Sequence, residues 1–472
     1  MSRGAAWACL ALVGAAFAGS PALAHAHGLV GRQDLPIPRG LFVWAAAAVL
    51  IASFVGLAVL WPTPRLEGEQ RQRRVLAVPR ALVVVCGALG VATFALVVYA
   101  GLSGTQTPTA NLAPTFVYVI FWVGLAFVSL LLGDVFRAFN PWRAVGRAAG
   151  WIAQRAAGGR LPAPLDYPEW LGRWPAALGL LAFAWLELVY SGAEDPSVVA
   201  VAALLYAGVQ LVGMSLYGVE AWCRNADAFG VYFGLLGRLG VVDWRGRELW
   251  LRPVLSGAAR IAALPGTVAV FVVLIGTTSF DGFSQGPTWN GLAPDLQRAL
   301  IDLGVGQGTA LQLAFTFGLL VVVALIGGLY RLGTLGMRSV DPSHSAAELG
   351  RRFAHALLPI ALAYVVAHYF SYLAIQGQAI GYLLSDPLGE GSDLFGTAAA
   401  SIDYGVVSAN AVWYVQVGAL IVGHVAGLVL AHDRALTVFR EPRDAARSQY
   451  WMLTVMVALT CLGLWLLSAQ SA

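Results

Sequence analysis

The sequence contains no lysine, and charged residues occupy only 11% of its 472 positions. Soluble domains carry about 25% charged residues, so most of this chain cannot face water. Because 58% of the residues are hydrophobic, the composition predicts an integral membrane protein with the lipid bilayer as its main partner. All 29 basic residues are arginines that fall in short loops between apolar runs, which argues against a nucleic-acid partner.

Cysteine is also scarce. Cys9, Cys86, Cys223 and Cys461 are scattered along the chain and form neither a disulfide framework nor a CxxC metal site. The sequence also lacks a Walker loop, a Rossmann glycine run, an HExxH helix and a GxSxG elbow. The common templates of soluble enzymes therefore give no guide to its chemistry.

The first 24 residues have the pattern of a cleaved signal peptide. A basic start at Arg3 precedes an apolar run, and Ala22-Leu23-Ala24 fits a signal-peptidase site. Cleavage after Ala24 or after Ala26 would make His25 or His27 the first mature residue. A terminal amine beside an imidazole can chelate Cu(II), so His25 and His27 are candidate metal ligands, although they can equally be incidental residues at a cleavage junction.

About ten apolar segments follow, which predict an all-α polytopic membrane helix bundle in which residues 25–472 form a single domain. We expect the arginine-rich loops to lie inside the cell and the mature N-terminus outside, in a bacterial cytoplasmic (inner) membrane. Within residues 218–260, the apolar stretch AFGVYFGLLGRLG is expected to be an interfacial helix. The predicted spans are 41–61, 81–102, 113–133, 174–191, 197–217, 261–280, 309–330, 353–375, 408–431 and 449–468.

Two histidines fall well inside predicted spans, His368 in the eighth and His424 in the ninth. Ionisable side chains at membrane depth are rare and often functional. Both are candidate ligands for a divalent transition metal, copper or zinc, or for haem. They can also form a proton relay with an acid such as Glu187, or simply hydrogen-bond a neighbouring helix. His355 and His432 lie at the inner ends of the same spans.

Acidic residues gather on the outer side. Asp281 ends the sixth span, and Asp403 lies in the loop between the two histidine-bearing spans. Carboxylates near His368 can hold a metal ion and activate its bound water. Asp281, His368 and Asp403 are therefore the candidate catalytic residues, with solvated loop acids as the simpler interpretation of the two aspartates.

Several motifs resemble a family of bacterial polytopic membrane proteins labelled fenitrothion hydrolase. They are HGLVGRQDLPIPRG, FNPWRAVGR (139–147), TSFDGFS (278–284), HYFSYLAIQGQ and GHVAGLVLAHDRAL. The resemblance covers nearly the whole chain. It implies hydrolysis of an organophosphorus triester, an apolar small-molecule substrate, and allows a second membrane subunit as partner.

Two other functions are compatible with the sequence. One is transport or handling of a transition metal, plausibly copper, with His25 and His27 as a capture site and His368 and His424 along the path. The other is electron transfer through haem or quinone, with the same intramembrane histidines as axial ligands.

Overall fold

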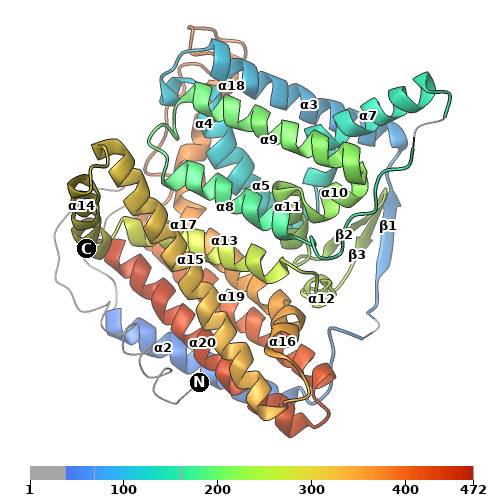
Figure 1. The fold of residues 1–472 in the computed structure, drawn as a ribbon, viewed down its shortest axis with the longest axis vertical. Coiled ribbons are helices and arrows are strands. Elements are labelled where there is room, and N and C mark those ends of the chain that lie inside the picture. Colours follow the sequence, from blue (N-terminus) through green and yellow to red (C-terminus); the bar gives the residue numbers. More distant parts are fainter. Residues whose placement is uncertain (1–38, 69, 160–161, 471–472) are drawn as a thin grey trace.

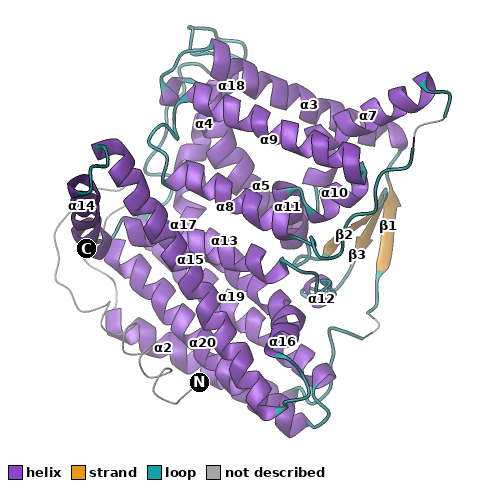
Figure 2. Ribbon diagram, in the orientation of Figure 1, coloured by secondary structure: helices purple, strands orange, loops and turns teal. Residues whose placement is uncertain are grey.

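The computed structural model describes residues 39–68, 70–159 and 162–470. Regular structure in this part of the chain is almost entirely helical (Figures 1 and 2). Seven of its helices are long and apolar enough to cross a membrane, and three shorter apolar helices accompany them. The predicted all-α polytopic membrane bundle is therefore confirmed. The predicted signal peptide, His25 and His27 lie outside the described residues.

A helix occupies each of the predicted spans. The first part of the chain forms α2 (Arg39–Leu60), α3 (Arg80–Ser103), α4 (Leu112–Thr115), the π-helix Phe116–Gly124, α5 (Leu125–Leu132), α6 (Phe136–Phe139), α7 (Pro141–Ala156), α8 (Trp174–Leu188), α9 (Pro196–Tyr217), α10 (Val219–Asn225) and α11 (Ala228–Gly237). The second part forms α12 (Ser256–Ala259), α13 (Thr267–Ser284), α14 (Pro287–Asp302), α15 (Gln307–Val340), α16 (Ala346–Phe353), α17 (Leu358–Gln376), α18 (Ile380–Ser385), α19 (Ala409–Val438) and α20 (Pro442–Gln470).

The helices form two groups (Figure 1). Helices α3 to α11 pack together in one group, which α18 joins by packing on α4, and the helices α13 to α17, α19 and α20 form the other. Helix α2 joins the second group, where it packs against α19 and α20. The groups meet where α8 packs on α13 and where the π-helix packs on α17. This junction matters because two candidate site residues lie on α13 and α17.

The loops sort onto two opposite faces. We call the loops 62–80, 134–173, 218–260, 331–352 and 432–448 the arginine-rich face. Arg434 links three of them, because its Nη1 and Nη2 atoms donate to the carbonyls of Arg352 and Ala259 at 3.0 and 2.6 Å. The connections between α3 and α4, α8 and α9, α13 and α15, and α17 and α19 make up the other face, which we call the acidic face. Two of them meet where Thr105 N donates to Leu388 O at 2.8 Å. Loops predicted to share a side of the membrane thus contact one another, and their assignment to the inside or the outside of the cell stays a prediction.

A small antiparallel sheet on the arginine-rich face was not expected. Its strands are β1 (Arg73–Ala77), β2 (Val242–Arg245) and β3 (Glu248–Leu251), in the order β1-β3-β2. The Arg74–Glu248 ion pair, 2.9 Å long, connects β1 and β3. The sheet joins the loop after α2 to the loop after α11, on the right of Figure 1.

The prediction of an interfacial helix in AFGVYFGLLGRLG is wrong. Most residues of α11 are buried, among them Phe229, Tyr232 and Phe233, and the helix packs against α5 and α8. An interfacial helix needs one polar face, whereas α11 is apolar all round and is therefore a core element.

Helices α17 and α19 approach each other closely because glycines face the contact. A Cβ atom on Gly423 would lie 2.3 Å from the Cβ of Ala363 and 2.6 Å from the carbonyl oxygen of Pro359. One turn on, a Cβ on Gly427 would lie 2.9 Å from the carbonyl oxygen of Ala356. The motif GHVAG is thus a small-xxx-small contact of the kind that packs membrane helices.

Candidate functional site

The intramembrane histidine of α17 is paired with the aspartate of α13. The Nε2 atom of His368 lies 2.7 Å from Oδ2 of Asp281, and the side chains are both 13% exposed. An ionised carboxylate only accepts hydrogen bonds, so the Nε2 atom carries the hydrogen and Nδ1 is the basic nitrogen of a neutral ring. Nδ1 makes no hydrogen bond to another described residue.

A tyrosine completes the immediate surroundings. The hydroxyl of Tyr369 donates to the same Oδ2 atom of Asp281 at 3.1 Å, and the Tyr369 ring meets the His368 ring edge-on, with 4.6 Å between centroids. Glu187 on α8 lies close enough to Asp281 and Tyr369 to interact with them electrostatically. Its own carboxylate makes no hydrogen bond within the described part of the chain. The site therefore contains residues from both helix groups.

Local helix structure explains how TSFDGFS tolerates so many polar groups. The hydroxyls of Thr277, Thr278 and Ser279 each donate to the carbonyl four residues earlier in α13, at 2.7 to 2.9 Å. This leaves Asp281 as the polar group of the motif that is directed at another helix. The opposing wall includes the π-helix, in which Tyr118 and Trp122 are buried, and such segments often occur at functional sites.

The structure does not bring Asp403 or His424 to this pair. Asp403 is exposed; its main chain exchanges hydrogen bonds with Gln378, and its carboxylate accepts from Gly405 N at 2.8 Å. His424 is fully buried, and its Nδ1 atom lies 2.7 Å from the carbonyl oxygen of Leu420 in the same helix. Its Nε2 atom is buried without a partner among the residues that the structure describes.

A metal centre does not emerge from the described side chains. No group of three or more His, Cys, Asp or Glu residues in the described ranges is arranged to hold a metal ion. The pair Asp281 and His368 supplies two donors at most, and His424 stands without a second donor. The expected copper or zinc site therefore does not fit the described donors at this place.

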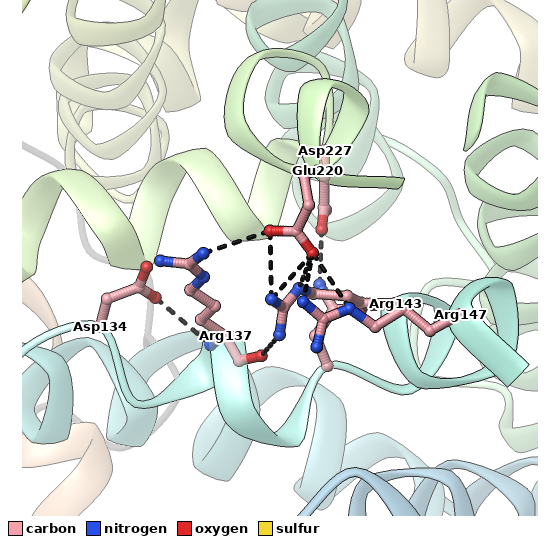
Figure 3. Close-up of polar contacts among 7 residues, drawn as sticks. Asp134, Arg137, Arg143, Arg147, Glu220 and Asp227 are labelled. Atoms are coloured by element: carbon pink, nitrogen blue, oxygen red, sulfur yellow. Dashed lines mark hydrogen bonds and ion pairs between the residues drawn. The ribbon is translucent and has the colours of Figure 1, made fainter. Parts of the chain in front are cut away.

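A second polar cluster lies on the arginine-rich face and was not identified as a site from the sequence (Figure 3). Glu220, on α10, accepts from the Nη2 atoms of Arg137, Arg143 and Arg147 at 3.2, 2.9 and 2.7 Å. Burial alone would raise the pKa of Glu220, but the three guanidiniums outweigh this effect and hold the pKa below its usual value of 4.5.

A buried aspartate anchors the same motif from a second side. Asp227, which is fully buried, accepts from Asn140 Nδ2, Trp142 Nε1 and Tyr206 OH, each at 2.7 Å. Burial raises the pKa of Asp227, and the hydrogen bonds from Trp142, Tyr206 and Asn140 oppose that rise. The FNPWRAVGR motif thus docks α7 onto α10 and α11, which is a structural role.

A third acid, Asp433, was also not identified from the sequence. Asp433, fully buried near the end of α19, accepts from the backbone N–H groups of Arg65, Leu66 and Glu67 and from Trp61 Nε1, at 2.5 to 3.1 Å. It fixes the chain that leaves α2. The sequence gives a weak signal here, because an acid directly follows a long apolar run in LAHDRAL.

Comparison of the chain with protein-family models, curated proteins and solved structures gives no match. The chemistry of the site is therefore argued from its own residues.

Proposed function

We propose that this chain is a membrane-embedded hydrolase in which His368, oriented by Asp281, acts as the general base on water. The observation that carries the proposal is the 2.7 Å contact between the two side chains, each only 13% exposed. A carboxylate on one imidazole nitrogen fixes the tautomer and stabilises the imidazolium that forms when the other nitrogen takes a proton.

The substrate class is an apolar organophosphorus triester, as the family resemblance implies. In the reaction, His368 Nδ1 takes a proton from water while the water oxygen forms a bond to phosphorus. The bond from phosphorus to the aryl oxygen breaks and releases a phenolate. The proton then passes from Nδ1 to the phenolate, so the products are a phosphodiester and a phenol.

The position of the pair suits a substrate that partitions into lipid. Asp281 lies near the end of α13, remote from Thr267 at its beginning, where Arg173 is hydrogen-bonded. If the arginine-rich face is cytoplasmic, as the positive-inside rule requires, the pair lies toward the outer leaflet of the bacterial inner membrane. No step is routed through a metal, because the described donors do not fit one.

The test is release of the substituted phenol from a triester such as fenitrothion by the purified chain. We expect His368→Gln and Asp281→Asn to lower the rate by about 100-fold or more, the usual contribution of a general base. Asp403→Asn is the matched control, because Asp403 is exposed and makes no hydrogen bond to the pair. Full activity in both site variants would disprove the assignment. If purification removes activity that a membrane extract restores, a second subunit is required.

Proton-coupled transport is the second candidate, favoured by one observation. Glu187 lies within electrostatic reach of Asp281 inside the helix bundle, and linked acids and histidines are typical of proton pathways. In this case a pH gradient across proteoliposomes would drive proton flux that Glu187→Gln abolishes. Hydrolysis that survives Glu187→Gln, without any proton flux in the parent protein, would reject transport in favour of the hydrolase.

A further inference from the structure

An arginine-lined cavity lies on the arginine-rich face, away from the Asp281–His368 pair. Its volume is about 180 Å³, and α7, α10, α11 and the loop before α8 contribute to it. Three carboxylates also line it, those of Asp134, Glu220 and Asp243, which leaves a surplus of positive charge. The arginines of the lining are Arg137, Arg143, Arg173, Arg224, Arg238 and Arg252.

Some of these arginines already have carboxylate partners. Arg143 and Arg137 share Glu220. Arg252 Nη1 lies 2.7 Å from Asp243 Oδ1, and its Nη2 donates to the carbonyl of Gly237 at 2.7 Å. Arg137, Arg143 and Arg252 are therefore held in place by carboxylates.

Arg173 is different, because it is buried without a counter-charge from any described residue. Arg173 is 9% exposed, and its Nη1 atom donates to the neutral Thr267 hydroxyl at 3.0 Å. Its Nε atom is buried with no hydrogen-bond partner in the described ranges. Burial, together with the nearby charge of Arg238, lowers the pKa of Arg173 to about 10. A buried guanidinium that lacks an anion is strongly disfavoured, so this environment calls for a negative ligand.

The cavity has two more arginines with no ion pair among the described residues. Arg224 and Arg238 are both exposed, and neither contacts a carboxylate in the described part of the chain. The third acid, Asp134, accepts a hydrogen bond from the backbone N–H of Arg137 at 3.3 Å, and burial raises its pKa. The cavity therefore has a buried cation within it and two accessible cations among its lining residues.

We propose that this cavity binds a phosphate group, with Arg173, Arg224 and Arg238 as its ligands. Guanidinium groups match phosphate oxygens in geometry and charge. The volume of about 180 Å³ suits a single phosphate group better than a whole nucleotide, since pockets for larger ligands measure about 300–1,000 Å³. The phosphate can belong to an anionic phospholipid headgroup or to a free phosphate anion, and basic pockets between membrane helices are known to favour the former.

The test compares ligand binding by the full-length protein and its variants. The unfolding temperature of the detergent-purified chain is measured with added inorganic phosphate and, separately, with phosphatidylglycerol or phosphatidylcholine. We expect stabilisation by phosphatidylglycerol, with Arg224→Gln and Arg238→Gln each weakening the apparent affinity by about tenfold, the value of one charge-assisted hydrogen bond. The matched control is Arg298→Gln, because Arg298 is 73% exposed and lies on the acidic face.

The outcomes separate the two ligand sources and decide the proposal. Stabilisation by phosphatidylglycerol alone assigns the site to a lipid headgroup, whereas stabilisation by inorganic phosphate as well assigns it to phosphate in general. Both exposed arginines can be replaced without opening the core, so loss of folding does not confuse the result. If neither ligand stabilises the protein, or if the variants and the control respond alike, the proposal is overturned. The result does not depend on hydrolase activity.

Discussion

His368 Nε2 and Asp281 Oδ2 lie 2.7 Å apart although 87 positions separate the two residues in the chain. Their hydrogen bond ties α17 to α13 at the junction of the two helix groups. A histidine and a carboxylate coupled inside a membrane bundle form a unit that can accept and release a proton. The proposed hydrolysis uses this unit without requiring a bound metal.

The ion cluster at Glu220 predicts a specific loss of stability in acid. Its pKa in the folded protein lies below 4.5, so its stabilising effect is complete above that pH and is lost as the pH falls through the lowered value. We expect the unfolding temperature of the parent protein to exceed that of Glu220→Gln near neutral pH and to approach it below pH 4.5. A temperature difference that stays constant across this range would contradict the stabilising role of the ionised carboxylate.

Asp227 should be sensitive even to a substitution of equal size. In Asp227→Asn, the new amide would present N–H groups to donors on Asn140, Trp142 or Tyr206, so at least one buried hydrogen bond is lost. We expect the free energy of unfolding to fall by about 1–3 kcal/mol, measured by thermal unfolding in one detergent. Asp195→Asn serves as the control, because Asp195 is exposed and its side chain does not cap α9. Equal stabilities of the two variants would refute the role of Asp227.

The hydrogen bonds of Asp433 predict that its replacement loosens the chain directly after α2. Removing its carboxylate in Asp433→Ala leaves four donors, from Trp61, Arg65, Leu66 and Glu67, without their acceptor. We expect destabilisation of about 3–5 kcal/mol, because several donors lose their acceptor at about 1–3 kcal/mol each when buried, and faster tryptic cleavage at Arg65. Asp295→Ala, an exposed position, should leave the cleavage rate unchanged. Unaltered cleavage at Arg65 in Asp433→Ala would show that the segment is held by other contacts.

The sequence identified the bundle correctly because membrane helices are specified by long apolar runs. It also indicated Asp281 and His368 individually, since each is an ionisable residue next to or inside such a run. The pairing could not be derived, because it depends on how α13 and α17 pack. Asp403 has the same residue type as Asp281, but local hydrogen bonds hold it in the outer loop.

The burial of two acids, Asp227 and Asp433, could not be predicted from the sequence. Both lie in short polar stretches that look like solvated loops, and their burial depends on donors from distant segments. The wrong prediction of an interfacial helix at α11 has a related cause. Its flanking arginines suggest a membrane surface, yet the helix itself carries no polar face and is enclosed by α5 and α8.

The most direct test of the proposed function is chemical rescue of His368→Ala by added imidazole. The rate of phenol release from a triester is measured for the purified protein, the variant, and the variant with imidazole. We predict a loss of about 100-fold in His368→Ala, with partial recovery when imidazole occupies the vacated place, and no loss in Asp403→Asn. Undiminished phenol release by His368→Ala would contradict the account.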